Sequence, residues 1–256
     1  MNILITAGGT SEKIDSVRQI SNTSTGRLGA FVAEAFAKYS PESNIVYICS
    51  ESAVRPQCAE IIIASDVISV GEAIRSACST KEFDIIIHSM AISDYRVRKV
   101  SDSALMTAGI LEKLSGIDCE DQLSLEKVIL GAVQSPRALN SDETSSKISS
   151  DKEDLIVVLE KSPKLIAMLR GLAPSATIVG FKLLSYVPEE ELINVAMALL
   201  KKNELDFVLA NDMRTVSTDS HEGLLVSPDG SYERAVSKEA IADLIAKRTL
   251  EQQKSR

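Results

Sequence analysis

Short apolar runs alternate with stretches of helical periodicity along most of the chain. The runs are rich in β-branched residues, which favours strands, and the stretches between them carry apolar residues three or four positions apart. The predicted strands are residues 2–6, 44–50, 60–64, 83–96 (running into a loop), 176–183 and 205–212. The predicted helices are residues 26–40, 69–81, 162–173 (with Ser162 as N-cap and Pro163 in the first turn), 188–203 and 237–252. The alternation predicts an α/β fold: a Rossmann-like three-layer sandwich with a mainly parallel central sheet and helices on both faces.

Three segments depart from this alternation. Residues 223–236 predict a hairpin around a Pro-Asp-Gly turn, and residues 147–164 predict a second hairpin. No strand pattern is visible from Lys99 to about Asp154, where two short helices (103–116 and 121–133) precede a polar loop (134–147). We expect a single domain over residues 1–256, with an insertion at about 99–146 that serves as a flap or a dimer arm.

Composition and charge disfavour nucleic-acid-binding, membrane-spanning, disulfide-bonded and zinc-binding proteins. The net charge of −8 disfavours binding to nucleic acid or to an acidic membrane surface. No basic segment precedes an apolar one at the N-terminus, and no apolar run approaches the roughly 20 residues of a membrane span. The four cysteines lack CxxC spacing, so we expect them to be reduced and mostly buried in a cytoplasmic protein. With only His88 and His221 present, a zinc site is disfavoured.

Polar residues follow four of the predicted strands. They occupy residues 6–10, 89–96, 180–182 and 210–212. Because the carboxyl ends of parallel strands meet at one edge of a sheet, where α/β proteins bind ligands, we expect a binding site there.

The loop after the first strand is unusually long for such a fold. Gly8 and Gly9 follow the strand, but the next glycine, Gly26, is seventeen residues further on, where the helix begins. The full G-x-G-x-x-G is absent, which disfavours an NAD dehydrogenase. Backbone N–H groups at the glycine pair and at the Ser24–Gly26 helix start suit an anion. Between them, Arg18 is suited to clamp a carboxylate or phosphate, and Asn22 is either a donor to it or a turn residue.

Residues 5–29, "ITAGGTSEKIDSVRQISNTSTGRLG", resemble the opening of phosphopantothenate–cysteine ligases, with a D-x-V-R-x-I-S-N-x-S-x-G core from Asp15 to Gly26. The family's other motifs are similar to "AISDYR" (91–96), "KISS" (147–150), "GFKL" (180–183) and "ANDM" (210–213). The resemblance covers most of the chain but not residues 99–143. "KISS" departs from the lysine-dense "KIKK" of fused bacterial ligases, although Lys147 is retained. Since the chain starts at the motif, we expect a stand-alone bacterial ligase rather than one fused to a flavin-dependent decarboxylase.

The resemblance implies a reaction and its partners. The family ligates 4′-phosphopantothenate to L-cysteine through an acyl-nucleotide, in coenzyme A biosynthesis. It implies CTP as co-substrate, with ATP as the alternative, Mg²⁺ on the phosphates, and a homodimer. Composition and charge lead us to expect a cytoplasmic protein with no nucleic-acid or membrane partner.

The resemblance also implies roles for individual residues. Lys147 would stabilise charge at the α-phosphate, Asn22 would bind the acyl-nucleotide or phosphopantothenate and assist the cysteine step, and Arg18 would clamp an anion or orient Asn22. For the metal no set of protein ligands is expected, and Asp94 is the one candidate. The remaining candidates are Gly8, Gly9, Ser24, Gly26, Asp94 (ribose or metal), Phe181 (base) and Lys182 (phosphate) for the nucleotide, and Asn211 for the substrate.

Two other functions remain open on the sequence. A nucleotide- or flavin-binding Rossmann-like oxidoreductase would carry a chromophore absorbing near about 340 or 450 nm. A non-catalytic nucleotide-binding module would bind CTP and release no pyrophosphate. The sequence also leaves open CTP against ATP, the role of residues 99–146, and which anion each half of the 7–26 loop holds.

Overall fold

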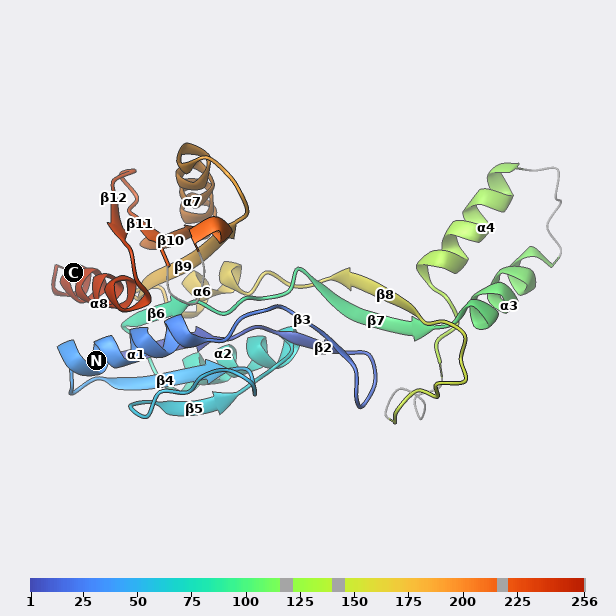
Figure 1. Ribbon diagram of the computed structural model, residues 1–256, viewed down its shortest axis with the longest axis horizontal. Helices are drawn as coiled ribbons and strands as arrows, with labels where there is room; N and C mark the ends of the chain where they lie inside the picture. The colour runs from blue at the N-terminus through green and yellow to red at the C-terminus, as the bar shows by residue number, and fades with distance from the viewer. Residues whose placement is uncertain (116–121, 140–145, 216–220, 256) are drawn as a thin grey trace. The chain divides into compact units, whose positions relative to one another are not determined.

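The computed structural model describes residues 1–115, 122–139, 146–215 and 221–255 (Figure 1). Contacts between residues divide the chain into two compact units. The first unit comprises Met1–Thr10, Asn22–Ile92 and Lys164–Arg256, and the second comprises Ser11–Ser21 and Ser93–Pro163. The expected insertion at 99–146 falls within the second unit, and its role as a flap or a dimer arm stays a prediction.

The first unit is built on an eight-stranded sheet with the order β12-β11-β10-β9-β6-β1-β4-β5 (Figure 1). Pairing is parallel from β10 to β5 and antiparallel from β10 through β11 to β12. The central strands are buried on both faces, which explains their continuous Ile- and Val-rich runs. The strands are β1 (Asn2–Ala7), β4 (Asn44–Cys49), β5 (Glu60–Ile63), β6 (Ile85–His88), β9 (Thr177–Leu184), β10 (Phe207–Asp212), β11 (Gly223–Val226) and β12 (Tyr232–Ala235).

Helices cover both faces of this sheet. One apolar cluster packs α1 and α8 against one face, and another packs α2, α6 and α7 against the other (Figure 1). A 3-10 turn (Met213–Thr215) follows β10. The Rossmann-like three-layer prediction is therefore confirmed. The helices are α1 (Arg27–Tyr39), α2 (Val67–Thr80), α6 (Ile166–Leu172), α7 (Glu189–Asn203) and α8 (Lys238–Lys254).

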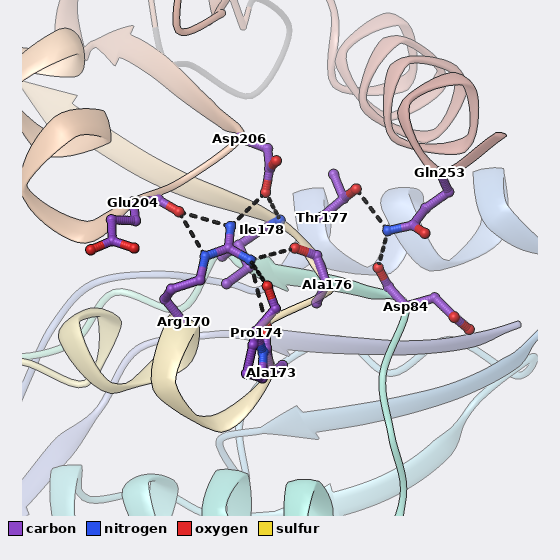
Figure 2. Close-up of polar contacts among 10 residues, drawn as sticks. All are labelled: Asp84, Arg170, Ala173, Pro174, Ala176, Thr177, Ile178, Glu204, Asp206 and Gln253. Atoms are coloured by element: carbon purple, nitrogen blue, oxygen red, sulfur yellow. Dashed lines mark hydrogen bonds and ion pairs between the residues drawn. The ribbon is translucent and has the colours of Figure 1, made fainter. Parts of the chain in front are cut away.

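A cluster of polar contacts joins the amino ends of β9 and β10 (Figure 2). Arg170 on α6 contacts Asp206 at 2.8 Å, and the same Asp206 oxygen accepts from the backbone N–H of Ile178 at 2.8 Å. The rest of the guanidinium donates to main-chain carbonyl oxygens of four residues: Ala173, Pro174, Ala176 and Glu204. Arg170 therefore holds the turns that lead into β9 and β10.

In its described parts, the second unit contains two short antiparallel sheets and two helices. A small apolar cluster of Val100, Leu139 and Ile148 forms its buried centre. The sheets pair β2 with β3 and β7 with β8. The elements are β2 (Ser11–Lys13), β3 (Gln19–Ser21), β7 (Tyr95–Ser101), α3 (Ser103–Leu114), α4 (Gln122–Gln134) and β8 (Ile156–Lys161).

Strand pairing in the second unit corrects two predictions. The hairpin predicted within residues 147–164 is wrong, because β8 pairs with β7 in the register Tyr95↔Lys161 and Ser101↔Ile156. β7 itself continues past Lys99, where no strand was expected. The two short helices predicted in this region are confirmed as α3 and α4. The hairpin predicted at 223–236 is also confirmed, as β11 and β12.

Helix α6 begins later than predicted. Ser162 is not its N-cap: the helix starts at Ile166 after Leu165. The backbone N–H of Ser162 donates to the carbonyl oxygen of Asp94 at 2.9 Å. This bond continues the β7–β8 pairing by one residue, so Ser162 belongs to the end of the strand pair rather than to the helix.

The described cysteines are less buried than expected. Cys49, Cys58 and Cys78 are free thiols, and of these three Cys49 is buried, Cys78 is half-buried and Cys58 is exposed. The expectation of mostly buried cysteines is therefore wrong for this part of the chain. Cys119 lies outside the described residues. Within the described ranges, none of the helices combines the length and apolar character needed to span a bilayer.

Candidate functional site

Three glycines meet where β1 ends and α1 begins. A Cβ on Gly8 (φ 89°) would lie 2.3 Å from the Ser50 hydroxyl oxygen, and a Cβ on Gly26 (φ 71°) would lie 3.2 Å from the backbone nitrogen of Gly8. A Cβ on Gly9 would lie 2.1 Å from the carbonyl oxygen of Asn22. Side chains at Gly8 and Gly9 would collide with these neighbours, and one at Gly26 would be crowded as well as strained by its positive φ. The structure thus brings the glycine pair and the helix start together, as the loop predicted.

Asn22 is fixed at the same place. Its backbone N–H donates to the Thr10 carbonyl oxygen at 2.9 Å, and its side-chain Nδ2 donates to the Ala91 carbonyl oxygen at 3.2 Å. Gly9 and Ala91 form an isolated parallel bridge, so β1 and the chain after β6 continue side by side beyond their regular pairing. The half-buried Asn22 side chain is therefore anchored to the "AISDYR" segment within the first unit.

Other predicted nucleotide residues also lie at this edge of the sheet. Ser24 is half-buried and precedes α1, whose N-cap is Gly26. Phe181 and Lys182 extend β9 just past its last pairing with β6, His88↔Gly180. Phe181 packs partly against the apolar cluster under α1 and α8, and Lys182 is half-buried.

Asn211 lies further along the edge, on β10. It is 9% exposed, and its Nδ2 lies 3.2 Å from Nε2 of His221. Asn211 lines a cavity of about 180 Å³, together with the charged side chains of Glu189, Asp212, Arg214, Glu222 and Arg234.

The charged side chains of this cavity are paired with one another. Arg234 pairs with Glu189 and Glu222, and Arg214 pairs with Asp212. The side-chain and backbone bonds from Arg214 hold the pKa of Asp212 well below its usual range despite burial.

The predicted residues Arg18, Asp94 and Lys147 belong to the second unit. Arg18 Nη1 lies 3.4 Å from Asp15, and its Nη2 donates to the Ile148 carbonyl oxygen at 3.4 Å. Lys147 directly precedes Ile148 and is exposed. Asp94 is exposed just before β7, and its carbonyl oxygen accepts from Ser162. The candidate residues are therefore divided between the two units.

A protein-built metal site is not evident in the described parts of either unit. Among the described residues, no group of three or more His, Cys, Asp or Glu side chains is placed to hold a metal ion. A divalent cation that enters with nucleotide phosphates needs few protein ligands, because the phosphates supply most of its oxygens.

Comparison with known families decides where the chain belongs. The family model of the DNA/pantothenate metabolism flavoprotein C-terminal domain matches residues 1–115 and 128–252. The chain belongs to this family. The match includes the glycine turn, Asn22, Asp94, the β9 segment with Lys182, Asn211, and also Lys147.

Similar proteins agree with this assignment. The coenzyme A biosynthesis bifunctional protein CoaBC of Thermococcus kodakarensis is 28% identical over 89% of this chain and 45% of its own length. The same-named protein of Methanocaldococcus jannaschii is 32% identical over 82% of this chain and 40% of its own. The chain thus spans less than half the length of these curated relatives. The solved structure of the DNA/pantothenate metabolism flavoprotein from Streptococcus pneumoniae is 29% identical, covers 98% of this chain and 99% of that one, and superposes with a TM-score of 0.76.

Sequence reasoning assigned no role to two buried polar groups. Asp15 belongs to the quoted motif, and its D-x-V-R spacing is typical of a side chain that caps its own turn. His88 was considered only as a zinc ligand, yet it ends β6 beside Thr6, with 2.9 Å between His88 Nδ1 and the Thr6 hydroxyl oxygen. A histidine at the carboxyl end of an otherwise apolar strand was the available signal for His88.

Proposed function

We propose that the protein ligates 4′-phosphopantothenate to L-cysteine through an acyl-nucleotide, as a step of coenzyme A biosynthesis. Membership of the family and the names of the CoaBC relatives support the pathway. The opening motif supports the reaction, since it resembles that of phosphopantothenate–cysteine ligases.

One observation carries the proposal: the two halves of this motif contact candidate residues, or their direct neighbours, in different units. The Asp15–Arg18 half contacts the backbone next to Lys147 in the second unit. The Asn22–Gly26 half packs on the Gly8–Gly9 turn in the first. A loop that only joined a strand to a helix would need neither set of contacts.

In the first half-reaction, a carboxylate oxygen of phosphopantothenate attacks the α-phosphorus of the nucleotide. The bond from that phosphorus to the bridging oxygen breaks, and pyrophosphate leaves. The exposed ammonium of Lys147 stabilises the negative charge that develops on the α-phosphate. Mg²⁺, bound to the phosphates, would neutralise charge on the leaving pyrophosphate.

In the second half-reaction, the cysteine amine attacks the acyl carbon. The bond from this carbon to the nucleotide oxygen breaks, the nucleoside monophosphate leaves, and the ammonium that forms loses a proton to solvent. An amide NH₂ carries two hydrogens, so Asn22 can bond to Ala91 with one and to the acyl oxygen with the other.

The choice of nucleotide and the assembly are also proposals. The partly exposed ring of Phe181 can stack on either base, so it does not distinguish CTP from ATP. We favour CTP on the resemblance alone. In this proposal Gly8, Gly9, Ser24, Gly26 and Lys182 contact phosphates, Asp94 contacts the ribose or the metal, and Asn211 and Arg18 bind substrate groups. We also propose a cytoplasmic homodimer, which light scattering after size exclusion would test.

A pyrophosphate-release assay tests the function. The protein is incubated with Mg²⁺, phosphopantothenate and either CTP, ATP, UTP or GTP, with and without cysteine. We expect pyrophosphate with CTP above all, and monophosphate release only when cysteine is added. The absence of pyrophosphate with every nucleotide would contradict the proposal, and a bound chromophore would favour an oxidoreductase.

A further inference from the structure

The carboxylate of Asp15 is the centre of the hairpin tip between β2 and β3. Its side chain is fully buried. Oδ1 accepts from the backbone N–H groups of Val17 at 2.8 Å and Arg18 at 2.7 Å, which closes a tight turn. Oδ2 accepts from the backbone N–H of Ile148 at 3.2 Å, across 133 residues of sequence. One carboxylate thus joins the opening motif to the "KISS" segment.

The backbone around Ile148 is held from both sides. Its N–H bonds to Asp15, and its carbonyl oxygen accepts from Arg18 Nη2 at 3.4 Å. Its side chain is 1% exposed and packs in the small apolar cluster of the second unit, which includes Val100. The peptide that carries Lys147 is therefore anchored, although the Lys147 side chain itself is exposed.

The electrostatics of the cluster match this arrangement. Burial raises the pKa of Asp15, but the three backbone N–H donors (Val17, Arg18 and Ile148) and the Arg18 charge outweigh it and lower the pKa below its ordinary value. Asp15 is therefore an anion at neutral pH. A neutral side chain of the same size would bind these donors less strongly.

We propose that Asp15 is a positioning residue for the first half-reaction, holding the Lys147–Ile148 backbone so that the Lys147 ammonium is presented in one place. The proposal rests on the ligase function and on the role of Lys147 proposed above. Asp15 touches no reacting atom in this scheme. It acts through the peptide of Ile148, whose N–H donates to Asp15 Oδ2.

A purely structural role for Asp15 in folding the hairpin is the competing explanation. If Asp15 only stabilised the hairpin, its substitution would lower the rates of both half-reactions together. The effect would then add to that of removing Lys147. If Asp15 positions Lys147, the Asp15 substitution should lower only the rate of pyrophosphate release. It should have no effect on that rate in a variant that already lacks Lys147. The two explanations therefore differ in a double-mutant cycle.

The experiment compares Asp15→Ala, Lys147→Ala and the double variant. Pyrophosphate release is measured with CTP and phosphopantothenate without cysteine, and the second step is measured with pre-formed acyl-nucleotide and cysteine. We expect Asp15→Ala to slow the first step about 10- to 100-fold and to leave the second nearly unchanged. The double variant should be no slower than Lys147→Ala. Full additivity, or an equal loss in both steps, would overturn the proposal.

Asp229→Ala serves as the matched control. Asp229 also caps a hairpin turn, accepting from Ser231 N–H at 2.9 Å and from its hydroxyl at 2.6 Å, but it is placed in the first unit between β11 and β12. We expect this variant to leave both steps unchanged. A loss of the first step equal to that of Asp15→Ala would show a general effect of turn capping and overturn the proposal.

Amide hydrogen exchange gives a readout that does not depend on activity. In Asp15→Ala the Ile148 amide should exchange faster, whereas the amide of Val157, in the β7–β8 pair, should not. Unchanged exchange at Ile148 would overturn the proposal. If Lys147→Ala itself leaves pyrophosphate release intact, the proposed role of Lys147 fails, and the positioning role falls with it. The Lys147→Ala single variant distinguishes this failure from that of the positioning role, because it retains Asp15.

Discussion

The ring of His88 lies beside the hydroxyl of Thr6, with 2.9 Å between Nδ1 and the hydroxyl oxygen, across the paired strands β6 and β1. The Thr6 oxygen also accepts from the backbone N–H of Met90 at 3.4 Å. The direction of the bond between Thr6 and His88 depends on the tautomer of the ring: a neutral imidazole with its hydrogen on Nε2 accepts from the Thr6 hydroxyl at Nδ1. A charged ring would lose this acceptor.

This relationship predicts a pH dependence of stability. Burial lowers the pKa of His88 to about 4, so the unfolded chain binds a proton near its ordinary value of 6.5 while the folded chain does not. Stability is therefore full above that value and falls as the pH drops toward 4. We expect a loss of about 2 kcal/mol between about pH 7.5 and about pH 5. Urea unfolding at a series of pH values measures it.

His88→Gln is the variant for this prediction. It should make the slope between these pH values shallower. It should not abolish the slope, because burial also lowers the pKa of His221, which contributes with the same sign. An unchanged slope would show that the pKa of His88 is the same in the folded and the unfolded chain, which would contradict the prediction.

Asn22 should act in the second half-reaction alone. In Asn22→Ala the backbone bond to Thr10 remains, so we expect a stability loss of only about 1 kcal/mol from the missing bond to Ala91. Pyrophosphate release should continue and the acyl-nucleotide should accumulate, as followed by mass spectrometry in the presence of cysteine. Failure to release pyrophosphate would place Asn22 in the first step instead.

The glycine turn should be intolerant of a methyl group at Gly9. A Cβ there would lie 2.1 Å from the Asn22 carbonyl oxygen, so Gly9→Ala must displace the backbone that carries Asn22. We expect destabilisation by about 1–3 kcal/mol and loss of the cysteine step. Gly171→Ala is the control, because nothing lies within 4 Å of its Cβ position on α6. It should stabilise the protein by about 0.5–1 kcal/mol. Equal effects on chemical unfolding would disprove the steric argument.

Arg170 should be important for stability at the amino ends of the strands (Figure 2). Its side chain is 20% exposed and its partner Asp206 is 10% exposed, so Arg170→Ala would remove the guanidinium from a nearly buried ion pair. We expect a cost of about 3–5 kcal/mol in the free energy of unfolding. Arg248→Ala, which breaks two ion pairs at the surface, should cost about 0–1 kcal/mol. A similar cost for both variants would contradict the burial argument.

The fold of the first unit was predictable because its signals are local. Apolar runs gave the parallel strands, and the apolar spacing after Gly26 gave α1, which ends at Tyr39. The pairing of β7 with β8 was missed because a strand partner about sixty residues away leaves no local pattern. The late start of α6 was missed for a related reason: Ser162 bonds to Asp94 rather than to the helix.

The candidate site was predictable in its residues and not in its arrangement. The resemblance pointed to Arg18, Asn22 and Lys147, but nothing in the residue spacing shows that the opening loop forms a hairpin, β2–β3, whose tip meets Ile148. A contact across 133 residues depends on the folded second unit. The role proposed for Asp15 therefore depends on a contact that the sequence alone does not indicate.

An isotope-transfer measurement tests the central claim, the acyl-nucleotide, most directly. Phosphopantothenate labelled with ¹⁸O in both carboxylate oxygens is turned over with CTP, Mg²⁺ and cysteine, and the products are analysed by mass spectrometry. Attack of the carboxylate on the α-phosphorus predicts one ¹⁸O atom in the cytidine monophosphate and none in pyrophosphate. Label in inorganic phosphate or pyrophosphate, or unlabelled monophosphate, would contradict the account.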